Sequence, residues 1–151
     1  MNSTSLRSFT ELKAWQKSRV VRKAISQLVK GFPTEEKYRL SDQIIRSCRG
    51  SCSNIAEGYG RFHEKDNARF CRMARGSHYE TMDHLSVAYD EEYISKEDLK
   101  THWAMADEAI RVVNGYLRYL TKFDSTGNSA SDPQEFYGTE EDIYTDSPED
   151  I

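Results

Sequence analysis

The residues best suited to chemistry in this sequence lie in the segment "SCSNIAEGYGRF", at residues 51–62. Acid–base catalysis by Glu57 would require a second titrating group, and the candidates Glu80 and His84 are distant in sequence. The segment is expected at the end of a helix rather than after a strand, and it lacks the spacing of a phosphate-binding loop. We therefore interpret Glu57 as a structural carboxylate that pairs with an arginine. The candidate partners are Arg46, Arg61 and Arg75.

Metal binding is the second chemistry that these residue types allow. Cys48 and Cys52 are four residues apart, and Cys71, His78 and His84 could supply further ligands. However, Cys48 and Cys52 fall on the apolar stripe of their helix, where thiols commonly act as small apolar groups. We therefore expect no metal, no cofactor and no enzymatic activity.

The cysteine count and the hydropathy indicate the compartment. Three cysteines are an odd number and do not resemble a disulfide framework, which favours reduced thiols in a cytoplasm. No stretch approaches the roughly 20 apolar residues of a membrane span, and the N-terminus lacks the apolar run of a secretory signal. We expect a cytoplasmic protein with no membrane partner.

Apolar residues recur at helical spacing in four segments, and no segment shows sustained alternation of apolar and polar residues. Because the connections are short, sequential helices should be antiparallel. The fold expected is therefore all-α, an up-down-up-down four-helix bundle. The helices are expected at about residues 10–30, from about 34 to the end of the 51–62 segment, at 64–90 and at 95–123.

Helix ends carry recognisable signals. Ser8 is followed three residues later by Glu11, as in a capping box, and Ser95 is placed to cap the last helix. Gly58 and Gly60 are expected to loosen the last turn of the second helix and to allow a left-handed cap.

The fourth helix carries two apolar faces. Its core stripe includes Trp103 and Leu117, and a second seam lies about 100° around the helix. A monomeric bundle needs one apolar face per helix, so the second face favours self-association, with a broad aromatic core as the alternative. The seam residues are Met105, Val112, Tyr116, Tyr119 and Phe123.

Charge divides the chain into a domain, residues 1–123, and a tail, residues 124–151. All 21 Lys and Arg residues and 16 of the 25 Asp and Glu residues lie in the domain, giving it a charge of +5. The tail holds the other nine acids and therefore carries −9. Its composition predicts disorder. The tail is a candidate partner-binding or self-masking arm, because it keeps four apolar or aromatic residues that could dock, Phe136, Tyr137, Ile143 and Tyr144. Solubility alone is the alternative role.

A basic stripe on the third helix is the candidate nucleic-acid interface, with further arginines from the second helix. A solvated charged face is the alternative, because phosphate contacts require no special pocket. If RNA binds there, the acidic tail should compete with it, and deletion of residues 124–151 should tighten binding at low salt. The interface residues are Arg46, Arg49, Arg61, Lys65, Arg69, Arg72 and Arg75.

The segments "FTELKAWQKS", "FPTEEKYRLSDQIIRS", "SNIAEGYGR", "ARGSHYET" and "YIS" occur in the order seen in the 23S rRNA intervening-sequence (S23) family, which this chain resembles over about residues 9–123. The chain departs from the usual family pattern at "RGSC", residues 49–52, and in its acidic tail. Gln43, Arg46 and Arg75 match the family motif, as do the residues that we assign a structural role. These are Asn54, Glu57, Gly58, Arg61, Gly76, Ser77 and Glu80.

The resemblance implies a left-handed antiparallel bundle, commonly a pentameric ring, without enzymatic activity. The fold is also similar to the accessory protein of diversity-generating retroelements, which binds a reverse transcriptase and RNA. Two functions stay open. One is an oligomeric accessory module that binds RNA or a nucleic-acid-handling protein, and the other is a scaffold that binds only proteins.

Overall fold

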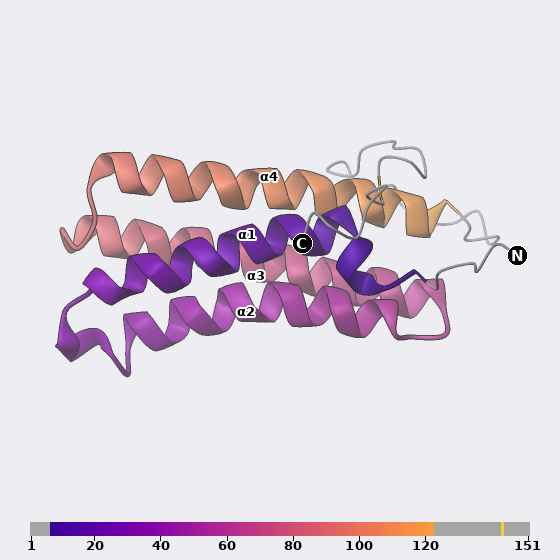
Figure 1. The fold of residues 1–151 in the computed structure, drawn as a ribbon, viewed down its shortest axis with the longest axis horizontal. Helices are drawn as coiled ribbons and strands as arrows, with labels where there is room; N and C mark the ends of the chain where they lie inside the picture. Colours follow the sequence, from indigo (N-terminus) through magenta and orange to yellow (C-terminus); the bar gives the residue numbers. More distant parts are fainter. Residues whose placement is uncertain (1–6, 123–142, 144–151) are drawn as a thin grey trace, which may run out of the picture.

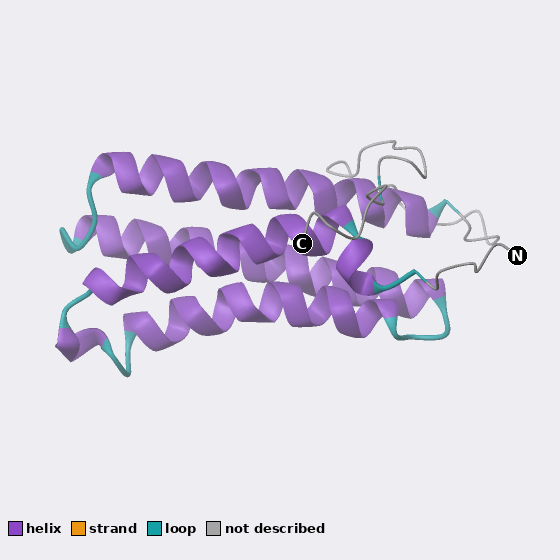
Figure 2. Cartoon of the chain, in the orientation of Figure 1, coloured by secondary structure: helices purple, strands orange, loops and turns teal. Residues whose placement is uncertain are grey.

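The computed structural model describes residues 7–122 and residue 143, and none of them lies in a strand (Figures 1 and 2). Each helix contacts its neighbours in sequence, and the first also contacts the last, so the chain runs alternately up and down around one bundle. The predicted all-α, up-down-up-down four-helix bundle is confirmed. The helices are α1 (Lys13–Leu28), α2 (Leu40–Tyr59), α3 (Glu64–Asp90) and α4 (Lys96–Thr121).

The helix starts follow the predicted signals with one shift. Ser95 caps α4 by accepting a hydrogen bond from the Asp98 amide at 3.0 Å. Ser8 and Glu11 form the expected capping box, but it closes a short 3-10 turn, Phe9–Glu11, and α1 begins after that turn. The predicted bounds of α3 agree with the structure at both ends.

The predicted start of the second helix was wrong. Thr34–Glu36 is a separate 3-10 turn, and Arg39, with φ −122° and ψ −109°, interrupts the chain before α2 begins. Glu36 nevertheless serves the positive end of α2, because its Oε2 accepts a hydrogen bond from the Leu40 amide at 3.0 Å. That bond, and a second one from Tyr93 Oη, lower the pKa of Glu36.

The core consists of two apolar clusters with a polar layer between them. One cluster lies at the end that holds the start of α1, and the other at the end that holds the α1–α2 connection. Between them Ser18 Oγ of α1 lies 2.7 Å from His78 Nε2 of α3, and both side chains are fully buried. Ser47 Oγ of α2 similarly lies 2.8 Å from Thr81 Oγ1 of α3.

Two residues of α4 differ in burial from the prediction. Trp103 was expected in the core but is 41% exposed, whereas Tyr116 was assigned to the second seam but is 3% exposed. Tyr116 is buried because its hydroxyl accepts a hydrogen bond from Asn67 Nδ2 of α3 at 2.8 Å, which gives its polar end a partner inside the bundle.

Gly58 has a different role from the one predicted. Gly60, the residue after α2, has φ −76°, so no left-handed cap ends the helix. A Cβ on Gly58 would lie 2.7 Å from Asn67 Oδ1 and 2.9 Å from Phe70 Cβ. Gly58 therefore lets α2 approach α3 closely.

We predict that Gly58→Ala destabilises the protein by about 1–3 kcal/mol, because the added methyl group overpacks the contact with α3. Gly76→Ala is the matched control, since a Cβ there meets nothing within 4 Å. That control should stabilise the protein by about 0.5–1 kcal/mol through helix propensity. Urea unfolding measures both changes, and equal effects of the two variants would contradict this role of Gly58.

We also predict that His78 makes stability depend on pH. Burial lowers its pKa from 6.5 to about 4, so the folded protein keeps the imidazole neutral where the unfolded chain protonates it. The contribution of His78 to the free energy of unfolding should be fully present above pH 6.5, and the free energy should fall by about 3 kcal/mol as the pH drops toward 4. His78→Gln should remove this part of the slope in urea unfolding followed against pH, and an unchanged slope would contradict the assignment.

Candidate nucleic-acid interface

The positive charge of the domain is concentrated on α1. This helix contains five Lys and Arg residues and no Asp or Glu, whereas α3 contains four basic and five acidic residues. Choosing candidates from the stripe on the third helix therefore missed the most basic element, which a charge count for each helix would have found. The basic residues of α1 are Lys13, Lys17, Arg19, Arg22 and Lys23.

Two adjoining hollows form a groove between α1 and α2, which we call the α1/α2 groove. Arg49 of α2 lines both hollows, whose volumes are about 440 and about 420 Å³. The first hollow is also lined by Trp15 and Arg22 of α1, and none of its lining residues among those that the structure describes is acidic. The second has an apolar floor that includes Val29 and Ile45, and Asp42 is its acidic lining residue.

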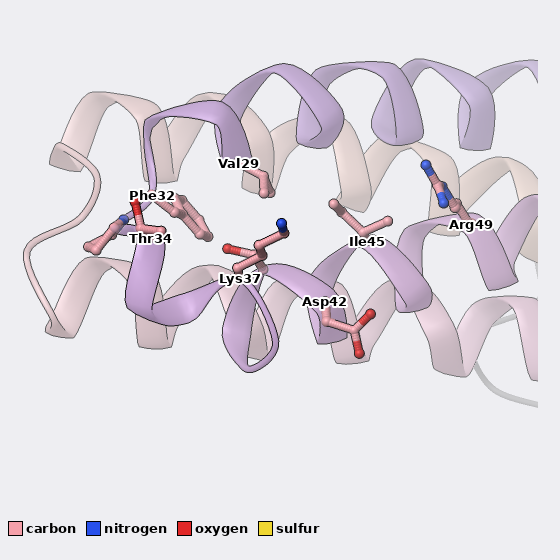
Figure 3. A pocket seen from close by; sticks show the side chains of 9 residues that line it. Val29, Phe32, Thr34, Lys37, Asp42, Ile45 and Arg49 are labelled. Atoms are coloured by element: carbon pink, nitrogen blue, oxygen red, sulfur yellow. The ribbon is translucent and has the colours of Figure 1, made fainter.

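Figure 3 shows the second hollow from close by. The side chains of Lys37 and Arg49 extend from their backbone toward α1, while that of Asp42 points away from α1. Asp42 is also paired, since its Oδ2 lies 3.2 Å from Arg46 Nε. The groove therefore presents cationic groups above an apolar floor, and the carboxylate of Asp42 forms an ion pair with Arg46.

Trp15 positions the arginines of α1. The guanidinium carbons of Arg19 and Arg22 each lie 5.8 Å from the centroid of its ring, and the ring itself is 8% exposed. A cation above an indole face is attracted by the quadrupole of the ring. The indole thus restricts both side chains at the groove, so less conformational entropy is lost when they bind an anion.

A second basic cluster lies at the connection between α2 and α3. Arg61 and Arg69 both lie over the Phe70 ring, at 4.7 and 4.9 Å from its centroid. Arg61 Nη2 also lies 2.7 Å from Glu57 Oε1, which identifies Arg61 among the candidate partners of Glu57. Because both side chains are about half exposed, this pair contributes only about 0.3–0.5 kcal/mol. Arg69 Nε lies 3.7 Å from Asp66 Oδ1, a longer ion pair.

The seven arginines and lysines predicted from the sequence do not form one face. Arg49 lies in the α1/α2 groove with Arg46 beside it, and Arg61 and Arg69 lie at the α2–α3 connection. Arg75 points toward α4, where its Nη1 donates a hydrogen bond to Asn114 Oδ1 at 3.0 Å. The remaining two, Lys65 and Arg72, are exposed on α3.

The structure separates the groups that acid–base catalysis would require. Gly58 lies against Phe70, and the helices are antiparallel, so Glu57 is level with the start of α3. Glu80 lies ten residues further along α3, about 15 Å away at 1.5 Å per residue. Its Oε1 is 3.4 Å from His84 Nε2 on the same helix. The two carboxylates therefore cannot act on one substrate atom.

The other motif residues shape the surface of α2 and α3. Ser77 lies against α2, since a Cβ on Gly50 would be 3.5 Å from its Oγ. Gln43 and Gly76 are exposed and Asn54 is half-buried. No contact among these residues adds a titrating group to Glu57.

The cysteines are buried free thiols. Burial raises the pKa of Cys48 to about 11 and that of Cys71 to about 12, and it also raises the pKa of Cys52. Among residues 7–122 and 143, no three His, Cys, Asp or Glu side chains are grouped so that they could hold a metal ion.

The residues of the predicted second seam are only partly on the surface. Met105, Val112 and Tyr119 are half-buried and pack against the apolar clusters, and Tyr116 belongs to the core of the protomer. Phe123 lies outside the described residues.

These features define the class of protein, a four-helix bundle with a basic groove between two of its helices. The chain belongs to the family of 23S rRNA-intervening sequence proteins, whose profile matches residues 10–115. The predicted family is thus confirmed. No helix in the described part of the chain is long and apolar enough to cross a membrane.

A solved structure has the same fold. It is a protein of unknown function from the S23 ribosomal protein family of Bacteroides thetaiotaomicron, with a TM-score of 0.64 and 24% identity. The match covers 70% of this chain and 98% of that one. Comparison with curated proteins gives no match. The descriptions of the family and of the solved relative name no enzymatic activity.

Proposed function

We propose that this protein is a non-enzymatic accessory protein that binds RNA along the α1/α2 groove. The observation that carries the proposal is the charge of this surface. α1 has five basic residues and no acidic residue, and the described residues around the hollow of Trp15, Arg22 and Arg49 include no carboxylate. A guanidinium matches the geometry of a phosphate, and its charge never titrates in a protein.

RNA is the preferred nucleic acid because of the family. Its description refers to intervening sequences of 23S rRNA, which are transcribed into RNA. The groove offers cations and apolar side chains, but the described part of its lining has no set of amide side chains for reading base edges. Binding should therefore depend on the phosphate backbone and be largely independent of sequence. The proposed relation to reverse-transcriptase accessory proteins would place the RNA in an RNA–protein assembly.

We predict that Arg22→Glu combined with Arg49→Glu weakens binding of a single-stranded RNA oligonucleotide at least tenfold in about 50 mM salt. Loss of two phosphate contacts should reduce the slope of log K against log salt by roughly 1.4. Fluorescence anisotropy over a salt series measures both quantities. The double reversal of Arg69 and Arg72 tests the stripe on α3 in the same assay, and it should have the smaller effect.

The matched control reverses two exposed lysines at the start of α4, Lys96→Glu with Lys100→Glu, which changes the net charge by the same amount. An equal loss of affinity in this control would show that only net charge matters and would contradict a groove. If the unaltered protein binds no RNA in low salt, the scaffold function replaces the RNA-binding function.

Self-association is the second part of the proposed function. Met105, Val112 and Tyr119 remain half-buried in the single chain, so association would remove further apolar surface from water. A ring of protomers would repeat each basic groove and increase the affinity for a long RNA.

We predict that light scattering at micromolar concentration gives a multiple of the 17.5 kDa protomer mass, and five times that mass if the ring of the family is formed. Val112→Glu with Tyr119→Glu should return the mass to that of the protomer while circular dichroism still shows a helical protein. A mass near 17.5 kDa for the unaltered chain would contradict self-association.

A further inference from the structure

Ile143, far beyond the bundle in sequence, is part of the core. Its side chain is 4% exposed and belongs to the apolar cluster that contains Leu12, Trp15 and Leu120. Its carbonyl oxygen accepts a hydrogen bond from the backbone amide of Lys13 at 2.9 Å. The acidic tail is therefore attached to the bundle at this residue.

The attachment uses a backbone amide at the start of α1. Lys13 is the first residue of α1, and the first four amides of a helix have no partner within the helix. The preceding residue, Leu12, has an extended backbone and a side chain that cannot cap these amides. Ile143 thus supplies a backbone acceptor and an apolar side chain at the same place.

This attachment point is next to the α1/α2 groove. Trp15 belongs to the cluster around Ile143 and also lines the first hollow together with Arg22 and Arg49. Along α1, Arg22 lies nine residues beyond Lys13, about 14 Å away. The eight residues after Ile143 can span up to about 26 Å when extended. They are long enough to reach every arginine of the groove.

The charges of the two parts are complementary. The segment after Ile143 is "YTDSPEDI", which has three carboxylates, Asp146, Glu149 and Asp150, and no basic residue. Arg22 and Arg49 line the first hollow of the groove, and Arg19 lies beside it over the Trp15 ring. None of the described residues that line this hollow has a carboxylate. Because the segment is attached nearby, its carboxylates are present at a high effective concentration.

We propose that residues 144–151 bind along the α1/α2 groove of their own chain, with Ile143 as the anchor and the three carboxylates on Arg19, Arg22 and Arg49. The groove is thus a binding site for a short acidic peptide, and its resident ligand is this segment. A consequence, which rests on the proposed function, is that the segment competes with RNA for the groove.

Paramagnetic relaxation locates the segment directly. A nitroxide on Ser147→Cys in the full chain labels that position selectively, because Cys48, Cys52 and Cys71 are buried. In low salt, the amide signals of residues 15–22 of α1 and 49–53 of α2 should be broadened at least fivefold more than those around Gly76 on α3. Absent broadening, or broadening concentrated on α3, would overturn the proposal.

Two sets of variants separate the anchor from the charges. Asp146→Asn with Glu149→Gln and Asp150→Asn leaves the core unchanged and should remove most of the broadening. Ile143→Asp should remove it as well, whereas Ile143→Val, which keeps an apolar anchor, should retain it. Full broadening in the triple variant would overturn the role of the charges, and full broadening in Ile143→Asp would overturn that of the anchor.

Mixed samples and RNA complete the test. When labelled chains are mixed with isotope-enriched unlabelled chains, the enriched signals should stay sharp, and broadening there would overturn binding within one chain. None of these measurements contains RNA, so they are independent of the proposed function. Addition of a saturating RNA oligonucleotide should then sharpen the groove signals. Broadening that persists beside bound RNA would overturn the groove as the RNA site while leaving the peptide site established.

Discussion

The close contact between α2 and α3 determines where the functional side chains of this bundle lie. Small side chains make the contact at three levels: Gly58 lies against Asn67 and Phe70, Gly50 faces Ser77, and Ser47 bonds Thr81. Because these pairs determine how α2 is rotated, its opposite flank, with Ile45, Arg49 and Cys52, faces α1. The position of Arg49 in the groove is therefore a consequence of Ser47, Gly50 and Gly58 on the other side of its helix.

The polar layer in the middle of the bundle determines the register between helices rather than adding to stability. A buried Ser18–His78 pair offers little net stabilisation, because both groups lose their hydration on folding. Sliding α1 along α3 by one turn would leave both groups buried without partners, at a cost of about 1–3 kcal/mol for each. The pair therefore favours one alignment of α1, and that alignment brings Trp15 and Arg22 level with Arg49.

The sequence was sufficient for the fold and much less so for the site. α3 was predicted with its bounds because its apolar residues keep one period between clear breaks. The start of α2 was missed because Thr34 and two acids have the composition of a helix start, although the backbone of Arg39 interrupts it. Tyr116 could not be assigned because a helical wheel gives its direction but not its partner, which is Asn67 on another helix. Likewise, one helix alone shows no groove, since Arg22 and Arg49 meet only across α1 and α2.

The acidic tail is attached beside the most basic helix, α1. An unattached tail of nine carboxylates would be attracted to any basic surface, and at 0.1 M salt that attraction would be largely screened beyond a Debye length of about 10 Å. Attachment at Ile143 favours one basic surface over the others, because it holds one point of the tail at the first residue of the most basic helix. The apolar part of the contact is not screened by salt, so raising the ionic strength weakens the ion pairs while the anchor stays in place. A ligand for the groove therefore competes with a segment that is held nearby even when its charges are screened. If RNA binds in the groove as proposed, contacts from several phosphates are therefore needed to displace the three carboxylates of the segment.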